Sequence, residues 1–207
     1  MAIIPITIAG CGPGSLDYVT PAARHAIEQA QVLVGAKRLL DAFPNLAAER
    51  IVVGANIPQI LDAIAARLDQ RVVVLVTGDP GLCSLARPVL RRFGREACRV
   101  IPGISSVQAA FASVGIDWQN ARILSAHDTA PALDPSSLAT EEKLAVLAGN
   151  PANAAWLDAL VPALAPTHEI YLCENLTLDD ESVRRVETLP MNPASRSILL
   201  LIRKENI

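Results

Sequence analysis

The sequence predicts an α/β protein of two domains, with a mostly parallel sheet in the first and a smaller mixed α/β second domain. The first observation is the uninterrupted apolar run Val72–Val76, which is typical of a strand buried on both faces in a parallel sheet. The second is that short apolar runs alternate with helical patterns from residue 3 to residue 115. The third is that later runs are joined by turns alone, which favours antiparallel pairing.

Composition excludes several classes of function. The chain has 207 residues, of which 51% are hydrophobic and 19% charged, so it can build sizeable cores. Its net charge of -3 offers no general attraction for nucleic acid, which needs clustered positive charge. The 4 cysteines and 3 histidines are scattered without the spacing of a metal site or a disulfide framework. No basic leader or membrane-length apolar run is seen, so we expect a cytoplasmic protein that binds no nucleic acid, membrane or metal.

The first strand, Ile3–Ala9, leads into a glycine-rich loop and then a helix. Thr20 suits the N-cap of that helix and Pro21 its first position. The loop differs from a dinucleotide-binding fingerprint because Ser15 replaces the third glycine and Pro13 removes a backbone donor. A phosphate-binding P-loop is also excluded, since no Gly-Lys-Ser/Thr follows. We therefore expect this loop to bind a ligand without phosphates.

The following elements repeat the strand–loop–helix pattern. Strands are expected at 32–35, 50–53, 72–76 and 99–101, with helices at about 57–68, 84–93 and 107–114. In a parallel sheet the loops 10–20, 78–84 and 102–106 emerge at one edge, where such sheets bind ligands. The sequence therefore predicts a shared pocket. The alternative is that Gly78-Asp79-Pro80-Gly81 is only a tight turn.

The pattern changes near residue 118, where we place a boundary between domains 1–117 and 118–207. Strands are expected at 121–126, 143–148, 168–173, 183–189 and 197–203, and an irregular loop at 128–137. A helix follows Asn150-Pro151, and Pro162 is expected to kink it or end it early.

Three motifs together resemble the tetrapyrrole (corrin/porphyrin) methyltransferase family. They are Gly10-x-Gly12-Pro13-Gly14-x-x-Asp17-x-x-Thr20, Gly78-Asp79-Pro80, and Pro102-Gly103-Ile104-Ser105-Ser106. Further segments, Val34–Leu40, Pro102–Gln108 and Cys173–Thr177, resemble the CbiE-type carbon-5 methyltransferases of cobalamin synthesis. Relatives tend to carry Ser-Leu-His-Gly-Arg where this chain has Ser125-Ala126-His127-Asp128-Thr129, so no substrate role is carried over to that loop.

The resemblance implies a two-domain methylase that binds S-adenosylmethionine in a cleft between its domains and methylates an anionic tetrapyrrole, here precorrin-7 or cobalt-precorrin-7. It implies a homodimer and leaves open a separate carbon-15 methyltransferase/decarboxylase partner. The implied cofactor-binding residues are Pro13, Gly78, Asp79, Leu82, Ser105, Ser106, Leu147, Ala148 and Asn175, and the implied substrate-binding residues are Gly12, Asp17 and Arg38.

The residues agree with such a reaction without assigning a catalytic group. Methyl transfer to a carbon depends on in-line positioning, and the sequence shows no nucleophile–base or paired-acid constellation. Asp17, Tyr18 and His127 are candidate proton acceptors but are equally explained by capping or loop packing. The alternatives are a related methyltransferase acting on another tetrapyrrole, on RNA or on protein, and a non-catalytic module that binds a small molecule.

Overall fold

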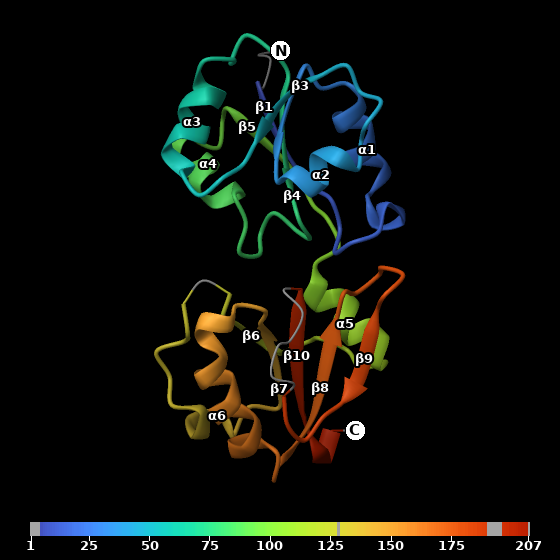
Figure 1. The fold of residues 1–207 in the computed structure, drawn as a ribbon, viewed down its shortest axis with the longest axis vertical. Helices are drawn as coiled ribbons and strands as arrows, with labels where there is room; N and C mark the ends of the chain where they lie inside the picture. The colour runs from blue at the N-terminus through green and yellow to red at the C-terminus, as the bar shows by residue number, and fades with distance from the viewer. Residues whose placement is uncertain (1–4, 128, 190–195, 207) are drawn as a thin grey trace. The chain divides into compact units, whose positions relative to one another are not determined.

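The computed structural model describes residues 5–127, 129–189 and 196–206. It divides into two compact units, residues 1–105 (unit 1) and 106–207 (unit 2) (Figure 1). The division falls before helix α5 (Ser106–Val114), which contacts a strand of unit 2, whereas the sequence analysis placed the boundary near residue 118. Among the described residues, no helix combines the length and apolar character that crossing a bilayer requires.

Unit 1 contains the predicted parallel sheet. Its strands are β1 (Ile6–Gly10), β2 (Val32–Gly35), β3 (Glu49–Val52), β4 (Val72–Val76) and β5 (Cys98–Ile101), in the order β3-β2-β4-β1-β5. All neighbouring pairs are parallel. Every residue of β4 is buried, because this central strand is covered on both faces.

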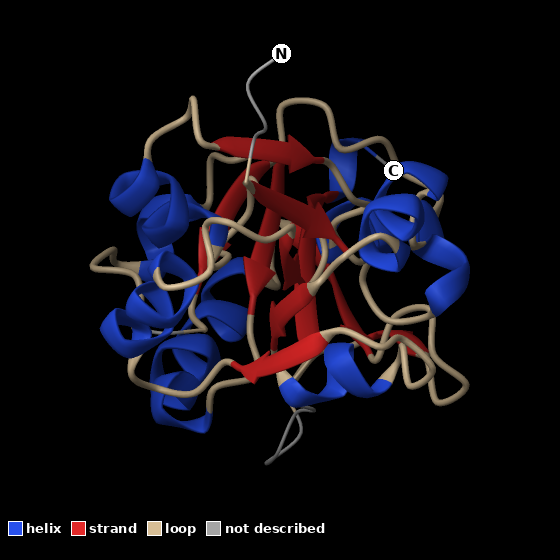
Figure 2. Ribbon diagram, turned by 90° about the horizontal axis from the view of Figure 1, so that it is seen from above, coloured by secondary structure: helices blue, strands red, loops and turns tan. Residues whose placement is uncertain are grey.

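Helices cover both faces of this sheet, as the labelled ribbon shows (Figure 1). Figure 2 colours the same ribbon by secondary structure and shows helices flanking the strands. The helices are α1 (Pro21–Glu28), α2 (Lys37–Asp41), α3 (Ile57–Ala65) and α4 (Ala86–Phe93). Alternate strand residues point to opposite faces, so Ile8 packs in one core with α3 and α4 while Ala9 packs in the other with α1 and α2. Helix α1 begins as predicted, since the hydroxyl of Thr20 accepts a hydrogen bond from the Ala23 amide at 3.2 Å.

Unit 2 contains the predicted mixed sheet. Its strands are β6 (Arg122–Ser125), β7 (Lys143–Leu147), β8 (His168–Glu174), β9 (Ser182–Arg185) and β10 (Ser197–Arg203), in the order β6-β7-β10-β8-β9. Only β6 and β7 are parallel, because the later strands are joined by turns. Short 3₁₀ helices lie at Leu16–Tyr18, Pro135–Leu138, Pro151–Asn153 and Lys204–Asn206.

Helix α6 (Ala154–Leu164) corrects one expectation, because Pro162 does not end it. The proline lies in the last turn, where it removes one backbone donor, and the carbonyl of Val161 still accepts from the Ala165 amide at 2.9 Å. Leu157, Leu160 and Leu164 are buried against the sheet, and this burial holds the helix together beyond the proline.

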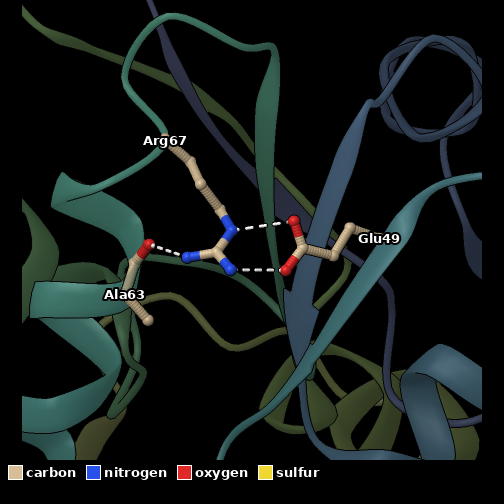
Figure 3. Close-up of polar contacts among 3 residues, drawn as sticks. All are labelled: Glu49, Ala63 and Arg67. Carbon is tan, nitrogen blue, oxygen red and sulfur yellow. Dashed lines mark hydrogen bonds and ion pairs between the residues drawn. The ribbon is translucent and has the colours of Figure 1, made fainter.

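An ion pair connects the edge strand β3 to the end of helix α3 (Figure 3). The guanidinium of Arg67 donates to both carboxylate oxygens of Glu49, at 2.8 and 2.5 Å, and to the carbonyl of Ala63 at 2.8 Å. The hydrogen bonds from Arg67 hold the pKa of Glu49 below its usual range. The pair fastens an edge strand that has only one strand neighbour.

Glu49→Gln should reduce the acid sensitivity of the fold. A carboxyl whose pKa is lowered by folding contributes stability that is present above its usual pKa of 4.5 and is lost as the pH falls through the lowered value. Denaturation midpoints measured between neutral and acidic pH should therefore fall less steeply in the variant below pH 4.5. Glu28→Gln, at an exposed position on α1, is the control; an equal change in both variants would contradict the role of the pair.

Candidate functional site

Three loops of unit 1 meet at the carboxyl edge of the sheet, as predicted. They follow β1, β4 and β5, which are adjacent and parallel. Gly12 and Gly78 form an isolated bridge, in which the Gly78 amide donates to the Gly12 carbonyl at 2.7 Å and the Gly12 amide donates to the Gly78 carbonyl at 3.3 Å. The loops therefore act as one assembly and not as independent turns.

The approach of these loops leaves no room for side chains at two positions. A Cβ atom at Gly103 would lie 2.3 Å from the Gly78 carbonyl oxygen and 2.8 Å from the Gly10 Cα. A Cβ atom at Gly10 would lie 2.6 Å from the Gly103 nitrogen. Glycine is thus required here so that the backbones can pack together, a role that the sequence motifs alone do not reveal.

The carboxylate of Asp79 fastens two of these loops to each other. One oxygen accepts a hydrogen bond from the Gly81 amide at 2.7 Å, within its own turn, and the other accepts from the Gly103 amide at 3.0 Å. The Asp79 carbonyl accepts from the Leu82 amide at 3.1 Å. The side chain is therefore a structural clamp, and its negative charge is held by backbone donors.

Arg38 lies at the same edge although it comes from a different loop. It follows β2 at the start of α2, and its guanidinium donates to the hydroxyl of Thr77, which directly precedes Gly78. Its side chain is exposed, so the charge remains accessible. Thr77 was not among the expected site residues, because a threonine hydroxyl 39 positions away in the chain gives no local signal.

Cys11 lies beneath these loops but has no thiolate chemistry to offer at neutral pH. Burial raises the pKa of its thiol to about 11, although a backbone hydrogen bond with Val76 and the charge of Arg38 act in the opposite direction. Burial also raises the pKa of Cys98 and takes that of Cys173 to about 12. Within the described ranges, no group of three or more His, Cys, Asp or Glu side chains could hold a metal ion.

The remaining expected residues of unit 1 surround this assembly. Pro13 is buried beside Gly12, and the short helix that carries Asp17 packs onto Gly12 through Tyr18, whose carbonyl oxygen would lie 2.8 Å from a Cβ there. Asp17 itself is exposed. Leu82 is half-buried, while Ser105 is only 7% exposed and directly precedes Ser106, the first residue of α5.

In unit 2 the expected residues Leu147, Ala148 and Asn175 also lie at one sheet edge. Leu147 and Cys173 both pair with Ile198, because β7 and β8 flank β10. The Ala148 amide donates to the Ser197 carbonyl at 2.9 Å, and the Asn175 side-chain amide donates to Asp180 at 2.8 Å. Asn175 has a φ of 50°, a left-handed conformation that asparagine tolerates better than most residues.

The sequence analysis missed two asparagines that shape this edge of unit 2. Asn153 donates to the Ala126 carbonyl at 2.7 Å and is 8% exposed, and Asn150 donates to the His127 carbonyl at 2.7 Å. Asn150 was recognised only as the cap of a helix. Its second contact spans 23 positions, which a local pattern cannot reveal.

Gly103→Ala should destabilise the protein, whereas Gly54→Ala should not. The added methyl group at residue 103 meets backbone atoms that cannot rotate away, so a loss of about 1–3 kcal/mol of unfolding free energy is expected. At Gly54 nothing lies within 4 Å of the new Cβ. Chemical denaturation of both variants measures the difference; equal stability would show that the loops are not packed as described.

Asp79→Asn should loosen the loops with little change in shape. An asparagine oxygen can replace one acceptor, but its NH₂ group then faces a backbone N–H, so one of the bonds to Gly81 or Gly103 is lost. Amide hydrogen exchange at Gly103 should become at least several-fold faster. Asp41→Asn, which removes an exposed carboxylate near the same edge, is the control and should leave that rate unchanged.

Comparison with known proteins agrees with this geometry. The family model described as Tetrapyrrole (Corrin/Porphyrin) Methylases matches residues 5–190. A cobalt-precorrin-7 C(5)-methyltransferase of Salmonella typhimurium is 35% identical over 188 residues, covering 90% of this chain and 91% of the relative. A probable cobalt-precorrin-7 C(5)-methyltransferase of Methanocaldococcus jannaschii is 29% identical, covering 86% of this chain and 87% of the relative.

Solved structures show the same fold at lower identity. The methyltransferase CobJ superposes with a TM-score of 0.80 at 21% identity, covering 96% of this chain and 94% of the other. A uroporphyrin-III C-methyltransferase of Thermus thermophilus, solved with S-adenosyl homocysteine, has a TM-score of 0.74 at 19% identity, covering 95% of this chain and 96% of the other. The predicted two-domain fold is confirmed, and the chain belongs to the tetrapyrrole (corrin/porphyrin) methylases.

Proposed function

We propose that this protein is an S-adenosylmethionine-dependent C-methyltransferase of cobalamin (corrin) biosynthesis that methylates carbon 5 of precorrin-7 or cobalt-precorrin-7. The observation that carries the proposal is the 35% identity to a cobalt-precorrin-7 C(5)-methyltransferase over 90% of the chain. The glycine-loop assembly of unit 1 falls within residues 5–190, which the family model matches, and it offers a backbone-lined surface at the end of a parallel sheet where such sheets bind ligands.

The residues at this edge fit S-adenosylmethionine. The cofactor carries no phosphate, so the donor lost at Pro13 is not needed, and Leu82 offers an apolar contact. Ser105 and Ser106 lie at the start of α5, where backbone amides favour a carboxylate such as the one that the cofactor carries. When bound, the cofactor supplies an electrophilic methyl group on a positively charged sulfur.

The hydrogen bonds of Asp79 are compatible with the positive charge on the cofactor sulfur. A free carboxylate against the sulfur would stabilise the charged ground state more than the transition state, in which that charge diminishes. Both oxygens of Asp79 instead accept backbone hydrogen bonds, so its charge is directed to Gly81 and Gly103. Gly78, the main chain at Asp79, and Pro13 then position the cofactor, and Leu147, Ala148 and Asn175 are assigned as further contacts on the resemblance alone.

Arg38 is the proposed contact for a carboxylate of the tetrapyrrole, with Gly12 and Asp17 beside it. Its bond to Thr77 places a guanidinium one residue from Gly78, and a guanidinium pairs with carboxylates in a fixed fork geometry. Binding and positioning are thus the tasks assigned to the described residues of this edge. No residue is assigned as a general base.

The proposed assembly is a homodimer, which rests on the resemblance alone. The resemblance also leaves open a separate carbon-15 methyltransferase/decarboxylase partner, and the cytoplasm is the location proposed from the sequence. Light scattering that gave a monomer would overturn the homodimer.

Incubation with labelled S-adenosylmethionine should transfer one methyl group to precorrin-7 or cobalt-precorrin-7. Calorimetry should show binding of S-adenosyl homocysteine but not of NAD or ATP, because the loops lack a phosphate cradle. If RNA, protein or another tetrapyrrole is methylated and these corrins are not, that molecule is the substrate and the proposed carbon-5 activity is wrong. Cofactor binding without any turnover on the corrins would favour a non-catalytic module.

Arg38→Ala should raise the KM for the corrin about tenfold or more, because a charge-assisted pair with a carboxylate is lost. The affinity for S-adenosyl homocysteine should stay the same. Lys37→Ala is the matched control, since it removes a neighbouring exposed cation that is paired with Asp41 at 2.6 Å. If both variants raise the KM for the corrin equally, Arg38 acts only through the overall positive charge and not through a direct contact with the substrate.

A further inference from the structure

A second concave site lies in unit 1, near the opposite end of the same sheet from the glycine loops. Its volume is about 530 Å³, which is within the range of small-molecule sites. Pro5, Thr7 and Val72 line it at the beginnings of β1 and β4, and Ala22 and Ala26 line it from helix α1. The glycine loops follow the ends of these strands, so the cavity is separate from the site described above.

The sheet register builds the floor of this cavity from three neighbouring strands. Thr7 of β1 pairs with Val73 of β4 on one side and with Arg99 of β5 on the other. These three side chains share the face on which α1 packs, because Val73 belongs to the same core as Ala23 and Ile27 of that helix. The helix that follows β5 groups with unit 2, so β5 has no crossover helix within unit 1.

The lining of the cavity is basic. Arg71 and Arg99 contribute guanidinium groups, His25 and Gln29 contribute polar groups, and no lining residue is acidic. The Nε of Arg71 donates to the Gln29 carbonyl at 2.8 Å, which fixes this side chain at the end of α1. The side chain of Arg99 is exposed and makes no hydrogen bond or ion pair with any residue that the structure describes.

The two arginines reach the cavity from different strands. Arg71 precedes Val73 by two residues, and Arg99 pairs with Thr7 on the other side of β1, so the cavity offers two separate cationic groups. Between them the cavity presents Thr7, Val73 and the alanines of α1. This arrangement suits a ligand with two anionic ends and a short apolar body.

We propose that this cavity binds a small dicarboxylate, with one carboxylate at Arg99 and the hydroxyl of Thr7 and the other at Arg71. The recognition is by charge and by the fork geometry of each pair, since guanidinium groups match carboxylates in geometry as well as sign. The site is independent of methyl transfer.

Glutarate is the probe, and binding to the full-length protein is measured by calorimetry at constant ionic strength. One glutarate per chain is expected, with affinity at least tenfold lower in Arg99→Gln because a charge-assisted contact is removed. Arg91→Gln is the matched control, since it removes an exposed arginine from α4 on the other face of the sheet and should leave binding unchanged. Thr7→Val, which keeps the size of the side chain, should also weaken binding.

Further measurements separate this site from the glycine loops. Saturating S-adenosyl homocysteine and the Arg38→Ala variant should both leave glutarate binding intact. Displacement of glutarate by S-adenosyl homocysteine, or loss of glutarate binding in Arg38→Ala, would overturn the proposal by placing the anion at the glycine-loop edge. Equal weakening in Arg99→Gln and Arg91→Gln, or tighter binding of inorganic phosphate than of glutarate, would overturn it as well.

Discussion

The contact among the backbones of Gly10, Gly78 and Gly103 is the constraint on which the candidate site depends. With 2.3 Å between a Cβ at Gly103 and the Gly78 oxygen, this contact tolerates no side chain at Gly103. The parallel order β4-β1-β5 brings the three loops to one edge, and the absence of side chains lets them merge into one surface. The shape of this candidate ligand-binding edge is therefore a packing property of the fold.

Charges are placed around this neutral contact in two different ways. The carboxylate of Asp79 accepts hydrogen bonds from the Gly81 and Gly103 amides, so its negative charge is stabilised within the loops. The positive charge of Arg38 stays exposed, with a hydrogen bond to Thr77 that limits where it can go. In an enzyme of the proposed function, the anionic substrate would then meet the exposed charge of Arg38, while the carboxylate of Asp79 is already occupied by backbone donors.

The sequence predicted the parts of the fold that depend on local patterns. These parts include the buried strand Val72–Val76, the helix cap at Thr20 and the mixed second sheet. Each depends on a pattern of residues that are neighbours in the sequence. The expected early end of the helix at Pro162 was wrong, because the burial of Leu157, Leu160 and Leu164 is a tertiary effect. Lys143 was equally hidden: it lies in a buried strand, and its ammonium is 2.7 Å from Asp117, 26 positions away.

The candidate site also depends on contacts between residues that are distant in the chain, which local sequence patterns do not reveal. The motifs identified which loops matter, but they gave no reason for a glycine at residues 10 and 103. The structure shows that Gly10 and Gly103 are required by each other, and not only to admit a ligand. The distinction matters for evolution of the site. A glycine that only admits a ligand can change when the ligand changes, whereas one that lets three backbones meet must persist in any protein that keeps this edge. Substrate differences within such a fold are therefore free to arise at side chains such as Arg38, which border the contact without forming it.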